Sequence, residues 1–167
     1  MPPDRRLLRE IRSAYQGMRE YQTNAGQFCF WFRFNQGATT SHPIYDTGPQ
    51  RAWYSPVTVP LLMGIYQRAA QNFDDGGLYL LDKLHVVLNY WDFFESTMPD
   101  PDPSGQNHLN DRVGFDGHLF SVDSFLPQGR VADYFLTISC VLAEVTQSEL
   151  QEDVVPSMFQ SYIVASG

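Results

Sequence analysis

The sequence predicts a mainly β protein: a small antiparallel β-barrel or sandwich with long loops and an N-terminal α-helix. Three observations predict it. The first twenty or so residues have the apolar spacing of a helix, several later segments alternate or run apolar between turn residues, and the last third contains a strong hairpin signal. A chain of 167 residues with 43% apolar residues fits one domain with a core of its own.

We expect three regions along the chain. Residues 1–24 form an amphipathic helix, residues 25–146 form the barrel domain, and residues 147–167 form a C-terminal extension. The barrel domain contains two long loops, at 35–56 and 98–110, where Gly, Pro, Ser, Asn and Asp gather. Loops of this length in a compact domain are often functional.

The helix is predicted from Asp4, a plausible N-cap, to about Tyr21. Its apolar face is formed by Leu8, Ile11, Tyr15 and Met18. A second stripe beside that face consists of Arg5, Arg9, Arg12 and Arg19. This stripe is either a solvated helix face or a docking surface for acidic residues of a neighbouring subunit or partner.

A first strand is predicted after the turn at 23–26, because the apolar period changes there to two. The side expected to face the core carries Phe28, Phe30, Phe32 and Phe34, and the other side carries Cys29, Trp31 and Arg33. Basic residues interleaved with the aromatics are nearly absent, which disfavours a base-stacking platform.

Five further strands are predicted. Val57 to Arg68 is interrupted by Pro60 and Gly64, which indicates an edge, a bend or a bulge. Leu78 to Trp91 is apolar on both faces, and a helix is possible near 92–95. The clearest pair, Arg112–Phe115 and His118–Leu126, flanks the hairpin dipeptide Asp116-Gly117. Tyr134 to Val145 follows as a long alternating strand.

The net charge of −8 is unevenly distributed. Residues 1–33 carry a balance of +3 and the remainder a balance of −11. An outer surface this acidic repels phosphates, which excludes proteins that wrap nucleic acid around themselves. No stretch approaches the ~20 uninterrupted apolar residues of a membrane span, and no apolar segment follows the basic N-terminus as in a secretory signal. We therefore expect a soluble protein.

The sequence shows no catalytic motif. It contains no Gly-rich phosphate loop, no HExxH, no GxSxG and no EF-hand pattern. The four histidines lack ligand spacing, and Cys29 and Cys140 are expected to be small buried hydrophobic residues rather than metal ligands. We expect no enzyme, no catalytic residue, no metal site and no cofactor.

Two segments resemble a known group of proteins. One is YDTGPQRAWYSPVTVP, from Tyr45 to Pro60. The other is HLNDRVGFDG, from His108 to Gly117, which continues through FSV at 120–122 and PQGR at 127–130 to LTI at 136–138. Together they resemble the head-to-tail stopper (head-closure) proteins of long-tailed bacteriophages that infect actinobacteria, within the broader head–tail joining group. The resemblance spans roughly residues 45–145.

The resemblance implies a structural protein of the virion, assembled in the cytoplasm of the bacterial host. Such proteins are small β-barrels that form a homo-oligomeric ring in the neck, below the portal and its adaptor. The ring closes the DNA exit channel after packaging and docks the tail. The implied partners are further copies of the chain, the portal-bound adaptor, and the tail terminator or tail tube protein. Double-stranded DNA would pass through the channel without sequence-specific binding, and no membrane is involved.

Two groups of residues are expected to serve this role. Contacts between subunits, or with the adaptor, are assigned to Arg5, Arg9, Arg12 and Arg19. Channel gating and tail docking are assigned to the two long loops, through Tyr45, Asp46, Arg51, Trp53, Asp100, Asp102 and His108. The sequence leaves open which loop gates the channel and which docks the tail.

Two other classes of function remain open. A different neck or tail component, such as an adaptor or a tail terminator, would have a similar barrel and similar loops. A small-molecule-binding barrel or an enzyme would instead require a concave pocket with convergent polar groups.

Overall fold

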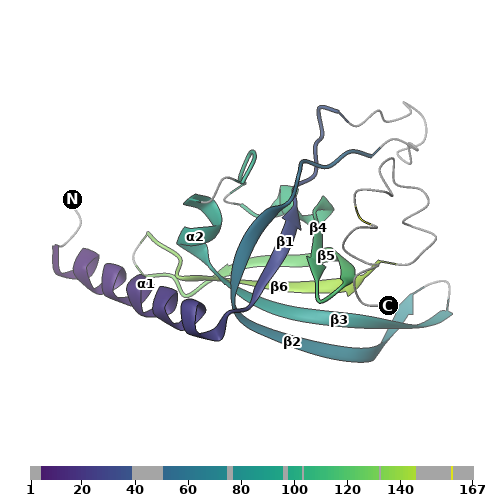
Figure 1. The fold of residues 1–167 in the computed structure, drawn as a ribbon, viewed down its shortest axis with the longest axis horizontal. Coiled ribbons are helices and arrows are strands. Elements are labelled where there is room, and N and C mark those ends of the chain that lie inside the picture. The colour runs from purple at the N-terminus through teal and green to yellow at the C-terminus, as the bar shows by residue number, and fades with distance from the viewer. Residues whose placement is uncertain are drawn as a thin grey trace.

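A computed structural model describes residues 5–38, 51–74, 77–95, 98–102, 104–131, 133–145 and 159. These residues form a closed antiparallel barrel with the strand order β1-β2-β3-β6-β5-β4, preceded by a helix (Figure 1). The predicted mainly β fold with an N-terminal helix is confirmed. No helix among the described residues is both long and apolar enough to span a membrane.

The elements follow one another in the order helix, three-strand half, short helices, three-strand half. They are α1 (Arg5–Ala25), β1 (Phe28–Phe32), β2 (Val57–Asp74), β3 (Gly77–Asn89), α2 (Tyr90–Glu95), a 3₁₀ helix (Gln106–Asn110), β4 (Arg112–Phe115), β5 (His118–Gln128) and β6 (Thr137–Glu144). Of the expected C-terminal extension, only Phe159 lies among the described residues.

Several element boundaries differ from the prediction: β2 continues to Asp74, β5 continues to Gln128 and β6 begins at Thr137. Two further differences, at the ends of α1 and β3, have a local reason. Helix α1 continues to Ala25, because Gly26 supplies the left-handed residue (φ 64°) that commonly ends a helix. Strand β3 ends at Asn89, whose side-chain oxygen accepts a hydrogen bond of 3.0 Å from the amide of Trp91. This cap starts α2, so Trp91 belongs to a helix and not to the preceding strand.

The predicted bulge and hairpin are both present. The β2–β3 register shifts between Leu61 and Met63, directly after Pro60, as expected for a residue that cannot donate to the ladder. Asp116 and Gly117 have φ values of 48° and 76°, the conformation of a two-residue type I′ turn, and they join β4 to β5.

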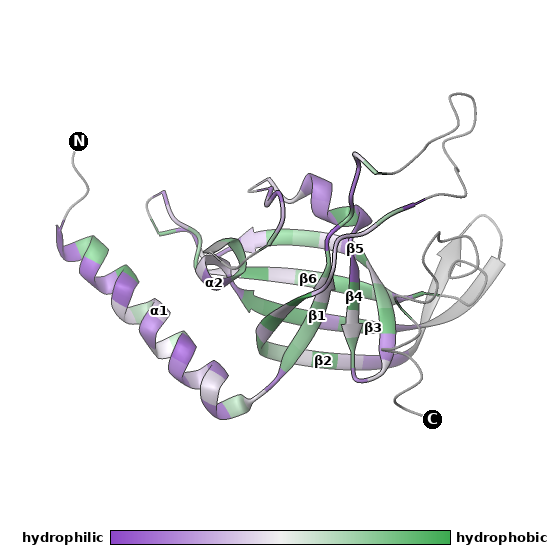
Figure 2. Ribbon diagram, turned by 45° about the horizontal axis from the view of Figure 1, so that its top comes forward, coloured by the Kyte–Doolittle hydropathy of each residue, from purple (hydrophilic) through white to green (hydrophobic). Residues whose placement is uncertain are grey.

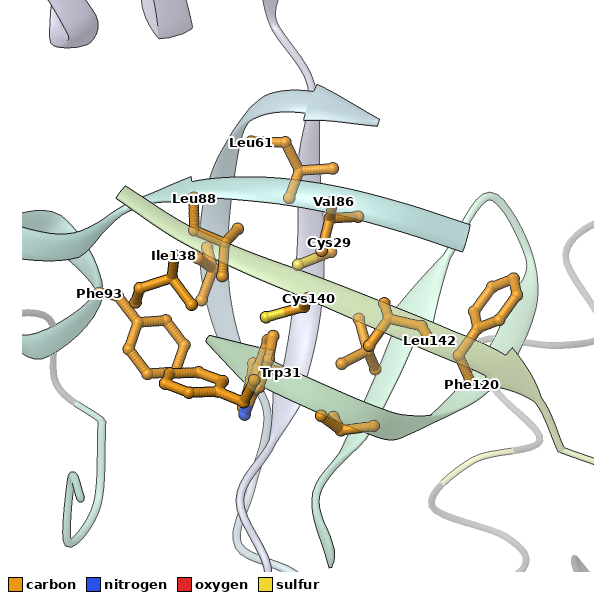
Figure 3. Packing of buried hydrophobic residues seen from close by; sticks show 14 of the residues in the cluster. Cys29, Trp31, Leu61, Val86, Leu88, Phe93, Phe120, Ile138, Cys140 and Leu142 are labelled. Carbon is orange, nitrogen blue, oxygen red and sulfur yellow. The ribbon is translucent and has the colours of Figure 1, made fainter. Parts of the chain in front are cut away.

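The barrel interior is filled by apolar side chains that converge from all six strands (Figure 3). A barrel this narrow leaves room for side chains only. From β1 the inward residues are Cys29 and Trp31, both fully buried. Cys140 is also fully buried, which confirms the interpretation of the two cysteines as core residues. Their partners include Leu61, Val86, Leu88, Phe93, Phe120, Ile138 and Leu142.

The expectation that all four phenylalanines of β1 and its extension are core residues is wrong for Phe28, which is 51% exposed. The period of two fixes the alternation of the side chains but not which side faces the barrel axis. The phenylalanines lie on the outer side. Phe32 is fully buried there beneath Trp53 and Phe159, with Phe30 and Phe34 partly buried against the same outer cluster.

Candidate assembly surfaces

The loop that precedes β4 is tied to the barrel by the buried carboxylate of Asp111. Asp111 is fully buried and accepts four hydrogen bonds. The donors are Trp31 Nε1 (2.7 Å), Arg33 Nη1 (2.8 Å), the amide of Phe34 (2.8 Å) and His108 Nδ1 (2.7 Å). A buried charge requires such partners. The network therefore joins the end of β1 to the loop at 98–111.

His108 takes part in this network as a neutral ring. Its Nε2 accepts a hydrogen bond of 3.1 Å from the amide of Asp102, so the proton of the ring lies on Nδ1 and is donated to Asp111. The ring stacks on Phe125 with a centroid distance of 4.7 Å. The side chain is fully buried. The buried ring of His108 therefore holds its loop from within, and the assignment of this loop to channel gating or tail docking stays a prediction.

Trp53 also holds its loop from within, and the role of that loop likewise stays a prediction. It is 5% exposed, and its Nε1 donates to the carbonyl of Asn110 at 3.1 Å. The guanidinium of Arg112 lies over its ring at 5.4 Å. Trp53 thus fastens one long loop to the other. Arg51 is half-buried, while Tyr45 and Asp46 lie outside the described residues.

Arg33, the buried cation of the network, also sets the shape of the loop tip. Its Nε and Nη2 donate to the carbonyl of Asp100 at 3.3 and 3.1 Å, and its Nη1 donates to the carbonyl of Asn107 at 2.8 Å. Asp100 has a left-handed φ of 45°, uncommon for a residue other than glycine. The backbone is thereby fixed from inside, and the side chain of Asp100 is exposed.

Asp102 stabilises the loop by its own carboxylate. The carboxylate accepts hydrogen bonds from the amides of Ser104 (2.9 Å) and Asn107 (3.0 Å), and from the Ser104 hydroxyl (2.8 Å). The Asn107 amide and then the Ser104 groups hold the pKa of Asp102 below its ordinary value, because they favour the charged form. The hydrogen bonds of the Asp102 carboxylate are therefore made within its own loop.

Helix α1 lies along the outside of the barrel, and its N-terminal part extends beyond it (Figures 1 and 2). It is fastened by Gln22, which donates to the carbonyl of Pro60 at 3.3 Å, and by Tyr15, whose hydroxyl donates to the carbonyl of Phe135. Burial, and then the neighbouring Tyr90 and Asp92, raise the pKa of Tyr15 to about 12. Over the rest of its length the helix alternates hydrophilic and hydrophobic residues, as Figure 2 shows.

A groove of about 480 Å³ lies between α1 and the start of α2, outside the barrel. Its apolar and aromatic lining comes from Leu8, Ile11, Tyr15, Trp91 and Tyr134, and its polar lining from Arg12, Gln16 and Arg19. Arg19 forms an ion pair of 2.7 Å with Asp92. Arg5, Arg9 and Arg12 are exposed. Of the predicted arginine stripe, Arg12 and Arg19 line the groove, and Arg5 and Arg9 are not among its lining residues. No sequence pattern had indicated the opposite wall of the groove, which Trp91 and Tyr134 form.

The outer face of the sheet is a second exposed apolar surface. The strand registers place Met63 beside Val87, Val87 beside Ser139, and Ser139 beside Leu126. The next outward residue of β2 is Ile65. Met63, Ile65 and Leu126 are 46%, 52% and 55% exposed, so apolar side chains are exposed on this face of the sheet.

No group of three or more His, Cys, Asp or Glu side chains is arranged to hold a metal ion in the described parts of the chain.

Comparisons with known proteins found a distant structural likeness and no match in sequence. No family model matches the chain, and no curated protein matches it. Among solved structures, a chain from "Virion of native gene transfer agent (GTA) particle" is similar, with 11% identity and a TM-score of 0.43. The similarity covers 71% of this chain and 94% of that chain. A likeness this distant carries no argument about function.

Proposed function

We propose that this chain is a structural protein of the bacteriophage neck: a head-to-tail stopper that forms a ring below the portal and its adaptor. The ring would close the DNA exit channel after packaging and would dock the tail. The proposal starts from the resemblance of segments 45–60 and 108–138 to stopper proteins. It is supported most by one observation, the combination of a packed barrel interior with a groove and exposed apolar side chains on the outside of the barrel.

The packed interior argues against a ligand-binding barrel. Trp31, Phe120 and Leu142 are fully buried inside the strands, and they occupy the space that a ligand would need. The described polar network around Asp111 is likewise saturated by its own donors and holds a loop in place. A general acid or base would have to reach a substrate, which a fully buried carboxylate cannot do.

The outer surfaces suit a ring. A closed ring is built from head-to-tail contacts, so each subunit must offer two different and complementary surfaces. The chain has an arginine-bordered groove on α1, an apolar outer sheet face and a rigid acidic loop tip at Asp100. The excess of acidic residues after residue 33 would give the channel a negative wall, which repels DNA and lets it pass.

The proposal is tested by removing the chain from assembling phage and restoring it from a plasmid. A stopper predicts complete heads that lose their DNA and complete tails that remain unattached, with joined particles recovered when the wild-type chain is supplied. Tails of abnormal length would favour the tail terminator instead. Normal numbers of joined, infectious particles without the chain would overturn the proposal.

A further inference from the structure

We infer that the groove on α1 binds the tip of the 98–102 loop, residues Asp100 and Pro101, of a second copy of this chain. The inference rests on the proposed function, since it names the contact by which one subunit of the ring would hold the next.

The lining of the groove is complementary to a ligand that is both apolar and acidic. Its lining is dominated by apolar and aromatic side chains, among them Trp91 and Tyr134, which favour a compact apolar group. Arg12 lines the same groove, is exposed and makes no ion pair with any described residue. An unpaired guanidinium beside an apolar surface is suited to a carboxylate, which it can bind through two parallel hydrogen bonds.

The loop tip has both properties. Asp100 and Pro101 are adjacent, both are exposed, and the Asp100 carboxylate has no partner among the described residues. Arg33 holds the carbonyl of Asp100 from below, so the tip is rigid before it meets a partner. A proline ring and a fixed backbone lose little conformational freedom on binding, which favours association.

The left-handed conformation of Asp100 strengthens the argument. A φ of 45° is strained for a residue other than glycine, and more so before a proline, which restricts its predecessor to extended conformations. Such strain persists only where the surrounding structure enforces it, and it gathers at functional sites. Here the buried guanidinium of Arg33 enforces it, and the consequence is an outward carboxylate.

Six other carboxylates in the described chain fit the groove less well. Those of Asp82, Asp92, Asp102 and Glu144 are bound to Tyr66, Arg19, Ser104 and His118. Asp133 lies 3.5 Å from Arg130, and Asp116 occupies a tight turn followed by Gly117 rather than by an apolar ring. A pocket of about 480 Å³ accommodates a small group such as Asp-Pro.

Engineered disulfides test the contact directly. Purified full-length Arg12→Cys and Asp100→Cys chains are mixed in equal amounts at high concentration and oxidised mildly. We expect a crosslinked dimer containing one chain of each kind, at several times the yield of either variant alone. The native thiols of Cys29 and Cys140 are fully buried and will not compete. The matched control is Asp116→Cys, another exposed aspartate with a positive φ.

The outcomes separate cleanly. Preferred crosslinking of position 12 to position 100 supports the inference, and equal yields with Asp116→Cys overturn it. A second measurement guards against a chance collision. Arg12→Glu and Asp100→Arg should each weaken self-association in sedimentation, by up to about fivefold as for a single exposed ion pair, and the two changes together should restore it. No restoration contradicts the pairing. If the crosslink forms but the chain is absent from the virion neck, the contact stands and the proposed function fails. If the neck holds a ring of this chain but no crosslink forms, the proposed function stands and the contact through the α1 groove is wrong.

Discussion

The indole Nε1 of Trp31 donates a 2.7 Å hydrogen bond to the carboxylate of Asp111, a residue 80 positions further along the chain. Trp31 belongs to the packed interior of the barrel. Asp111 anchors the end of the 98–111 loop, whose exposed tip carries Asp100. The same carboxylate receives the guanidinium of Arg33. The shape of the exposed loop tip is therefore set by the core of the barrel.

This link predicts that Asp111→Ala will lower the free energy of unfolding by about 3–5 kcal/mol, because Arg33 would remain as an uncompensated buried charge. Chemical denaturation monitored by tryptophan fluorescence measures the change. Asp133→Ala is the control: its side chain is 92% exposed, and we expect a change within about 0.5 kcal/mol. A cost at position 111 no larger than at position 133 would contradict the structural role of the network.

Two phenylalanines on the outer side of β1 are predicted to differ in how much they stabilise the fold. Phe32→Ala should cost about 3–5 kcal/mol, because the ring is fully buried and lies at 5.1 Å from the ring of Phe159. Phe28→Ala should cost well under half as much, because that ring is 51% exposed. Thermal and denaturant unfolding of both variants compare them directly. Equal losses would mean that the outer cluster is placed wrongly.

The loop around Asp102 is predicted to lose the stabilising hydrogen bonds of this carboxylate at low pH. Because its hydrogen bonds lower its pKa in the folded chain, the stabilisation that it provides is complete above the unfolded value, near pH 4. It is lost as the pH falls through the lower folded value. In an amide NMR titration, the signals of Ser104 and Asn107 should shift together with a midpoint below pH 4. Asp102→Asn should abolish that step, and a midpoint above about pH 4 would refute the assignment.

The two cysteines are predicted to be unreactive in the folded protein. Burial raises the pKa of the Cys29 thiol to about 12 and raises that of Cys140 even further, so neither forms the reactive thiolate near neutral pH. A thiol-specific reagent such as Ellman's should label no cysteine of the native chain and both after unfolding. Rapid labelling of the native chain would show that the barrel opens.

Local chemistry made much of this fold predictable. Asp116-Gly117 specified the hairpin, because only a few residue pairs adopt its turn, and the spacing of Ile11 and Tyr15 specified the face by which α1 packs. The direction in which β1 faces depended on what covers its outer side, and Phe32 is covered by residues 53 and 159, which are distant in sequence.

The network and the groove could not be predicted in the same way. Arg33 alternates with the inward residues Cys29 and Trp31, and a charge on an inward face requires a buried partner. The sequence pattern places Arg33 on the side opposite the expected core face, so nothing in the pattern indicated that it needs a buried acid or identified Asp111. The groove joins Arg12 to Trp91 and Tyr134, and only tertiary packing brings those three segments together. The helical pattern indicates the α1 side of the groove, but it does not indicate the side formed by Trp91 and Tyr134.

The most direct test of the account is a cryo-electron microscopy map of the neck of the purified virion, reconstructed without imposed symmetry. We predict density for this chain as a closed ring between the adaptor and the tail, with the α1 groove of each copy filled by the Asp100 tip of its neighbour. A neck in which this chain is absent would contradict the proposed function. A ring of this chain joined through other surfaces would contradict the α1 contact alone.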